Sequence, residues 1–117
     1  MQIEVAHSSG YVRIAVSDRS GLDDAREVAR QIMTAVQQGQ RRLMVSFRRS
    51  DPIFRVNDYL IDPLTRLAGI PGLKIALVAD TPELFAGFEY ISVVAAQKGV
   101  AEKPFRSDRD AVSWLLA

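Results

Sequence analysis

The sequence predicts a single α/β domain built on a mostly parallel sheet. Strand-like and helix-like segments alternate along the chain, as in parallel strands joined by right-handed crossovers. The stretch Leu73–Pro82 runs from a continuous apolar strand into a helix start, where Thr81 is an N-cap and Pro82 occupies N1. The first two strand-like segments, Gln2–Ala6 and Tyr11–Val16, alternate apolar and polar residues, as in an antiparallel hairpin. We therefore expect the order ββαβαβαβα, with an antiparallel N-terminal edge strand.

The composition is that of one globular domain. The 117 residues suffice for a single hydrophobic core, and the apolar and charged shares of 48% and 25% are ordinary. The net charge of +1 provides no general attraction for nucleic acid, so no nucleic-acid partner is expected. The chain has no Cys and therefore no disulfide. It shows neither a signal peptide nor an apolar run of roughly 20 residues that could span a membrane, so we expect a cytoplasmic protein.

The N-terminal half is expected to contain the hairpin, a helix and a strand. Residues 7–10 form the predicted hairpin turn. Ser20 is the predicted N-cap of the first helix, Asp23 completes a capping box, and Gly39 ends the helix. The next predicted strand is Arg41–Phe47. The apolar residues that recur at helical spacing and should face the core are Leu22, Ala25, Ala29, Ile32, Met33 and Val36.

The segment before the apolar strand at Leu73 is expected to be helical. Asp51 and Pro52 provide an N-cap and an N1 proline, and apolar residues recur from Ile53 to Leu67. Pro63 predicts a kink in this helix, or a break at which Asp62 caps a second short helix.

Two further helices and one strand complete the expected fold. The helix Glu83–Lys98 buries one apolar stripe, yet Phe85, Tyr90 and Val93 lie on its other side. That second apolar side is our candidate surface for a protein partner or for a second copy of the chain. A strand over Ala101–Phe105 and a final helix capped at its start follow.

Candidate binding residues are expected where the parallel strands end, because ligands of open α/β sheets bind outside the carboxyl ends of the strands. The four arginines predicted at this edge, beside helix N-termini that suit an anion, are Arg19, Arg48, Arg49 and Arg106. The alternative is that they are solvated side chains in capping loops. Ser50 is a candidate phosphorylation site, because a phosphate at a helix start gains from the helix dipole; otherwise it assists the cap.

The sequence contains no pattern typical of an enzyme. His7 is the only histidine, and its predicted turn lies at the opposite end of the sheet from the ligand edge, which argues against a catalytic triad. No glycine-rich phosphate loop occurs, and one His without Cys does not favour a transition-metal site. Asp80, Glu83 and Glu89 could hold Mg²⁺ only with further ligands, and Asp80 is expected to act in the turn instead. We therefore expect no catalytic residue, no metal and no cofactor.

The C-terminal half resembles the STAS-like family, the group similar to bacterial anti-sigma-factor antagonists (SpoIIAA-like). Lys74–Val78, Gly99, Phe105 and Ala111–Leu115 match its KxALV-type strand, its glycine before the last strand, its phenylalanine loop and its closing AxxWL. The resemblance implies a βα superhelix with strands in sequential order and a non-enzymatic role in protein–protein regulation. In the antagonists a serine at the start of the second helix is a phospho-switch. Ser50 lies near that place without the family's Asp-Ser-(Ser/Thr)-Gly context.

Three functions are compatible with the sequence. The one we favour is a binding or regulatory module that acts through a protein partner, with homodimerisation as one form of it. The second is a carrier of lipid or another small apolar ligand, held between the sheet and Ile53–Leu67; it follows from the similarity of such proteins to the lipid-carrying Sec14 type. The third, an enzyme, is least favoured because no nucleophile–base pair is visible.

Overall fold

The computed structural model describes residues 1–51 and 65–117. Most of the predicted helix before the fourth strand therefore lies outside the described residues, and only its end at 65–67 is seen to be helical. The described strands and helices are β1 (Gln2–Ser8), β2 (Tyr11–Ser17), α1 (Gly21–Gln37), β3 (Arg42–Arg48), β4 (Lys74–Ala79), α4 (Pro82–Gln97), β5 (Ala101–Phe105) and α5 (Asp108–Leu115).

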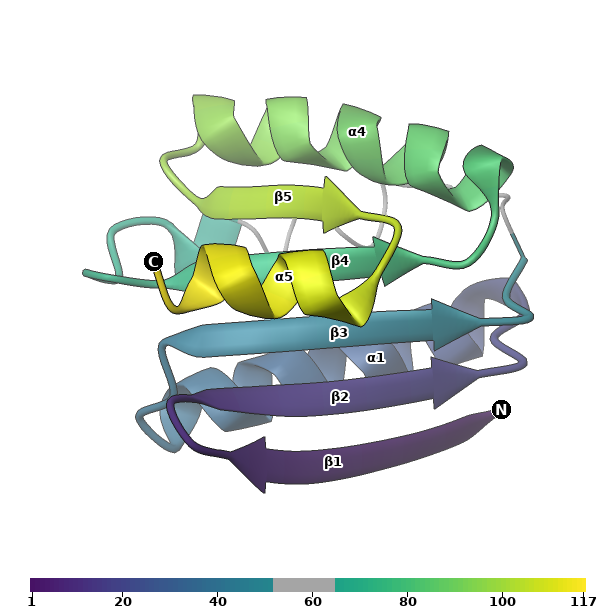
Figure 1. The fold of residues 1–117 in the computed structure, drawn as a ribbon, viewed down its shortest axis with the longest axis horizontal. Coiled ribbons are helices and arrows are strands. Elements are labelled where there is room, and N and C mark those ends of the chain that lie inside the picture. Colours follow the sequence, from purple (N-terminus) through teal and green to yellow (C-terminus); the bar gives the residue numbers. More distant parts are fainter. Residues whose placement is uncertain (52–64) are drawn as a thin grey trace.

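The five strands form one sheet in the sequential order β1-β2-β3-β4-β5 (Figure 1). β1 pairs antiparallel with β2, and every later pair is parallel. The carboxyl ends of β2, β3, β4 and β5 therefore meet at one edge, which lies at the right of Figure 1. The predicted fold class is confirmed: a mixed sheet with an antiparallel N-terminal edge strand and alternating β and α elements.

Helices cover both faces of the sheet. α5 lies on the face nearest the viewer in Figure 1, which we call the front face, and α1 lies on the back face. The back-face core joins α1 and α4 to alternate residues of the sheet, such as Ile14, Val45 and Leu77. The front-face core is smaller and joins Ala111 and Leu115 of α5 to the intervening strand residues. Because successive side chains of a strand point to opposite faces, the one sheet contributes to two separate cores.

The buried stripe of α4 is as expected: Leu84, Phe88, Ile91 and Ala95 are all buried. The inner side of α1 differs from the expectation. Leu22 is 41% exposed, whereas Val28 and Ala35, which the spacing rule left out, are buried.

Two local predictions at the N-terminal half are corrected. The hairpin turn contains only Ser9 and Gly10, because Gly10 adopts a φ of 89° and closes the turn in two residues. His7 therefore belongs to β1 and pairs with Val12, still at the sheet edge opposite the carboxyl ends. At the start of α1 it is Asp24, not Asp23, that accepts the backbone N–H of Ser20, at 2.8 Å.

Candidate functional site

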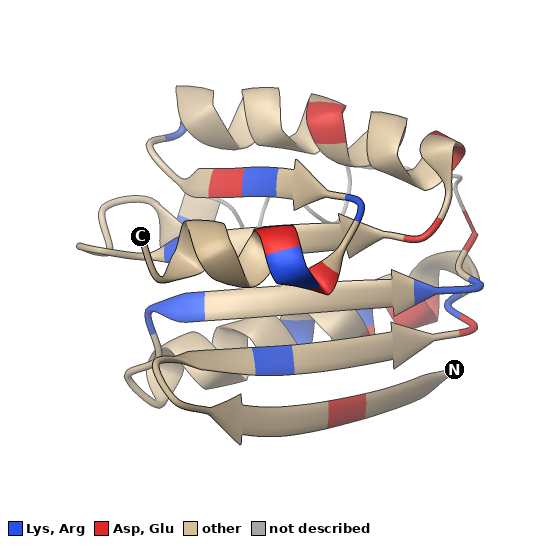
Figure 2. Cartoon of the chain, in the orientation of Figure 1, with Lys and Arg blue, Asp and Glu red and all other residues tan. Residues whose placement is uncertain are grey.

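The carboxyl ends of β3, β4 and β5 surround a polar hollow of about 450 Å³. We call it the edge hollow. Charged residues of both signs gather at this edge of the molecule (Figure 2). The residues that line the edge hollow are Ser46, Phe47, Arg48, Arg49, Val78, Ala79, Asp80, Arg106, Ser107 and Asp108. Three of the four arginines predicted for an anion site therefore do line one hollow.

Arg49 is held in place by the neighbouring loops. Its backbone has a φ of 48°, and Asp18, with a φ of 59°, is the other described non-glycine residue in the left-handed region. The Arg49 Nε donates to Asp18 Oδ1 at 3.0 Å, and the Arg49 backbone N–H donates to Asp80 Oδ2 at 3.0 Å. The hydrogen bond from Arg49 lowers the pKa of Asp18, and the same bond raises the pKa of Arg49. Because Asp18 already accepts from it, the Arg49 guanidinium is partly neutralised.

Arg106 is anchored by backbone carbonyls rather than by an acid. Its Nε donates to the Ala79 carbonyl oxygen at 3.2 Å, and its Nη2 donates to that of Asp80 at 3.4 Å. Arg48, at the end of β3, is exposed, and its side chain makes no hydrogen bond or ion pair with another described residue. Neither guanidinium has a carboxylate partner within the part of the chain that the structure describes.

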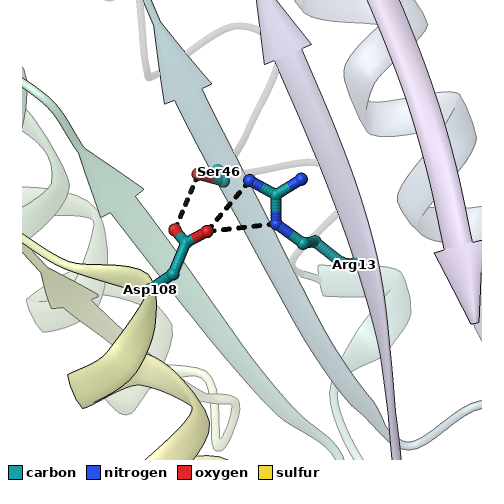
Figure 3. A network of polar contacts seen from close by, with 3 residues as sticks. All are labelled: Arg13, Ser46 and Asp108. Carbon is teal, nitrogen blue, oxygen red and sulfur yellow. Dashed lines mark hydrogen bonds and ion pairs between the residues drawn. The ribbon is translucent and has the colours of Figure 1, made fainter. Parts of the chain in front are cut away.

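Beside the edge hollow lies a network that the sequence did not reveal, formed by Arg13, Ser46 and Asp108 (Figure 3). Arg13 Nε and Nη2 donate to Asp108 Oδ2 at 3.1 and 2.9 Å, and the Ser46 hydroxyl donates to Asp108 Oδ1 at 2.9 Å. The network fixes the first residue of α5 over β2 and β3. The only indication of this network in the sequence is Ser46, a polar residue within the otherwise apolar run of β3, and the sequence does not show which residue it contacts.

Arg19, the fourth predicted arginine, lies elsewhere, so its assignment to this anion site is wrong. It is 4% exposed, its guanidinium stacks 5.9 Å from the centre of the Phe47 ring, and Nη2 donates to the Asp51 carbonyl oxygen. Burial lowers its pKa. The loop from β2 into α1 turns towards the back face, where the aromatic ring and the carbonyl receive the side chain.

Arg19 instead borders a small cavity on the back face, which we call the back cavity. Its volume is about 30 Å³, and its walls come from α1, β3, β4, α4 and β5. Most of its lining is apolar, but Glu102 of β5 reaches it. The residues around it are Arg19, Ala25, Val28, Ile32, Phe47, Leu77, Phe88, Ile91 and Glu102. The pocket predicted between the sheet and Ile53–Leu67 falls largely outside the described residues.

Glu102 is a further residue that the sequence did not single out. The residue as a whole is partly exposed, but its Oε2 atom is fully buried and has no hydrogen-bond partner among the described residues. Burial raises its pKa to about 8, so the carboxyl group is largely protonated at neutral pH. Its strand is short and carries charges on both sides, so alternation alone did not show which charge points inward.

Ser50 does not line the edge hollow. Its hydroxyl donates to the Arg48 carbonyl oxygen at 3.2 Å, and the residue is half-buried. The phosphorylation prediction is therefore neither supported nor contradicted by this geometry.

The predicted partner surface on α4 is only partly as expected. Tyr90 and Val93 are 53% and 58% exposed, but Phe85 is half-buried and packs against the back-face core. Phe85 therefore flanks the back-face core and is not part of the exposed side of α4, contrary to the prediction. Phe85 lies three positions before the buried Phe88, which places it at the border of the buried stripe.

Within residues 1–51 and 65–117, no group of three His, Cys, Asp or Glu side chains could hold a metal ion. No helix in these same ranges has the length and apolar character needed to cross a membrane. Comparison of the chain with models of known protein families, with curated proteins and with solved structures finds no match.

Proposed function

We propose that this chain is a non-enzymatic binding module of STAS-like type that acts in the cytoplasm through a protein partner. The observation that carries the proposal is the outer side of α4, where Tyr90 and Val93 remain more than half exposed. No Lys or Arg occurs between Pro82 and Gln97, and Figure 2 shows only acidic charge on this helix. Since α4 already buries a complete apolar stripe, its outer apolar residues are not needed to hold it on the sheet.

The partner can be a second copy of the chain or a different protein. Covering Tyr90 and Val93 in an interface would gain about 25 cal/mol for each Å² of apolar surface removed from water. Small residues beside them, Ala86 and Ala96, allow another surface to approach closely.

The test is the double substitution Tyr90→Asp and Val93→Asp, which leaves the buried stripe of α4 intact. If the chain self-associates, light scattering should give a mass above 13.0 kDa for the wild type and 13.0 kDa for the variant. If the partner is another protein, co-purification should be lost in the variant. Leu22→Asp is the matched control, because it also places an acid at an exposed apolar position. A double variant with unchanged mass and unchanged partner capture would contradict the proposal.

Ser50 is the candidate switch of this module. A phosphate on its hydroxyl would lie next to Arg48 and Arg49 in the chain and would replace the hydrogen bond to the Arg48 carbonyl oxygen. Ser50→Glu should then change partner binding, whereas Ser50→Ala should leave it at the unphosphorylated level. Equal binding by both variants would remove Ser50 from the proposal.

The second candidate function is a carrier of a small apolar ligand, and the back cavity is the observation that favours it. Its walls are mostly apolar, and Arg19 and Glu102 are the two polar residues of its lining, which suits a molecule with an apolar body and one hydrogen-bonding end. At about 30 Å³ the cavity accommodates only one or two water molecules, so a ligand requires the helices around it to separate. Native mass spectrometry of freshly purified protein should show a co-purifying ligand if the chain is a carrier, and the mass of the bare chain if it is not.

A further inference from the structure

The lining of the edge hollow carries more positive than negative charge. Its lining has three arginines and two aspartates. Asp108 is paired with the Arg13 guanidinium and accepts from Ser46, whereas Asp80 accepts the neutral backbone N–H of Arg49 and keeps its negative charge, so the lining as a whole remains positive. Among the lining arginines, only Arg49 forms an ion pair with a described carboxylate. Arg48 and Arg106 therefore remain as the two guanidinium groups whose charge no described acid neutralises.

We infer that the edge hollow binds a phosphate group, in a phosphate monoester or as free phosphate, between Arg48 and Arg106. A guanidinium presents a planar fork of N–H donors that matches two phosphate oxygens, and such charge-assisted bonds are among the stronger ones in proteins. The inference does not depend on α4, so it goes beyond the proposed function and can succeed or fail independently of it.

The hollow is partly preorganised for this ligand. Arg106 is oriented by the carbonyl oxygens of Ala79 and Asp80, so binding costs less side-chain entropy than it would for a free arginine. The Ser107 oxygen accepts the Asp110 N–H at 3.2 Å, which leaves its hydroxyl proton available to a phosphate oxygen. The Arg48 side chain can adjust to the ligand, because no hydrogen bond or ion pair with a described residue restrains it. One anchored and one mobile guanidinium can close on an anion from two sides.

The hollow is also large enough. Its volume of about 450 Å³ exceeds the needs of a phosphate alone and leaves room for the group that carries it. That group can belong to a small phosphorylated molecule or to a phosphorylated side chain of a protein. Both present the same dianionic head to Arg48 and Arg106, so the experiment has to separate the two sources.

The test is a titration of the ¹⁵N-labelled full chain, followed by NMR, with inorganic phosphate, with O-phosphoserine and with a short phosphoserine peptide. We expect saturable shifts at millimolar concentrations in the amides of residues 106–109 and in the Nε–H signals of Arg48 and Arg106. Tighter binding of the peptide identifies a protein source, and equal binding of all three identifies a small phosphorylated molecule. Equal binding of the unphosphorylated peptide, or shifts outside the edge hollow only, would overturn the inference.

Substitution of Arg48 provides a second and more specific test of the inference. Arg48→Gln should weaken phosphate binding about tenfold or more, the cost of losing charge-assisted hydrogen bonds, and Arg48→Lys should lie between it and the wild type. Because the Arg48 side chain has no described partner, neither substitution should change the thermal midpoint. Arg42→Gln is the matched control, since Arg42 is exposed on the same strand at the opposite edge of the sheet. Equal affinities for the wild type and Arg48→Gln would overturn the assignment.

Discussion

At the scale of single residues, Glu102 shows how one side chain couples stability to pH. Its Oε2 atom is buried on the back face without a hydrogen bond to any described residue, and burial raises the pKa of the carboxyl group from 4.5 to about 8. The native state therefore keeps a proton that the unfolded chain releases between these two values. Unfolding is accompanied by proton loss in this window, so the free energy of unfolding falls as the pH rises, by about 1.4 kcal/mol per pH unit from this group alone.

We predict that Glu102→Gln removes this dependence. Glutamine keeps the shape of the protonated acid but does not titrate, so the variant should be more stable than the wild type at pH 7, and the two should converge towards pH 4.5. Urea unfolding at several pH values between 5 and 8 measures the effect. Glu89→Gln, at an exposed position on α4, is the matched control and should retain the wild-type slope. Parallel curves for the wild type and Glu102→Gln would contradict the prediction.

The Arg13–Ser46–Asp108 network is the corresponding feature on the front face. Its three members come from β2, β3 and the start of α5, and Asp108 is separated from Arg13 by 95 positions and from Ser46 by 62. Buried Ser46 would be costly in an apolar layer without a partner, and Asp108 supplies that partner. The same contacts occupy both carboxylate oxygens, so Asp108 forms no ion pair with the neighbouring arginines of the edge hollow among the described residues.

At the scale of elements, the helix starts look alike in sequence but differ in structure. The Thr81 and Ser107 oxygens accept the N–H groups of Leu84 and Asp110, both at 3.2 Å. Ser20 is the N-cap residue of α1, but its side chain accepts no such hydrogen bond from the first turn of this helix. There the carboxylate of Asp24 accepts the Ser20 N–H instead.

We predict that Thr81→Ala lowers the free energy of unfolding by about 1 kcal/mol, because it leaves a backbone N–H of the first turn of α4 without its acceptor. Ser20→Ala should change stability by much less, since no cap hydrogen bond is lost. Denaturant unfolding of both variants measures the difference. Equal losses would mean that the Ser20 hydroxyl caps α1 in solution after all.

At the scale of the whole molecule, two cores share one sheet. β3 and β4 contribute to both faces: Leu43, Val45 and Leu77 point to the back core, and Met44 and Ala76 point to the front core. Neither core can lose its central strands without exposing the other. Strand pairing on both sides of β3 and β4 strengthens this dependence.

We therefore predict a single cooperative unfolding transition. Trp114, the only tryptophan, lies on the front face against Phe105 and beneath Lys74, so its fluorescence reports on the front core. Far-UV circular dichroism is dominated by α1 and α4 on the back face. The two signals should have the same denaturant midpoint. A separate, earlier fluorescence transition would show that α5 detaches on its own.

Local sequence patterns predicted the fold class, the order of the described strands and helices, and most of the boundaries of the described helices. These features depend on local properties: the period of apolar residues, Gly at turns and helix ends, and side-chain caps, all of which act within a few positions. The inner stripe of α4 and the two-sided alternation of β3 follow from the same rules. The STAS-like assignment, the protein partner and the carrier alternative remain proposals, because the residues behind them are mainly those of the fold.

Contacts between distant parts of the chain determine which charged residues share a site. The tertiary structure assigned Arg48, Arg49 and Arg106 to one hollow, moved Arg19 to the opposite face, and joined Arg13 to Asp108. It also placed the Oε2 atom of Glu102 in the interior and left Leu22 exposed, against the expectation from spacing. The physical reason is that contacts between distant strands and helices depend on register, loop direction and the length by which a helix extends past the sheet, none of which local periodicity specifies.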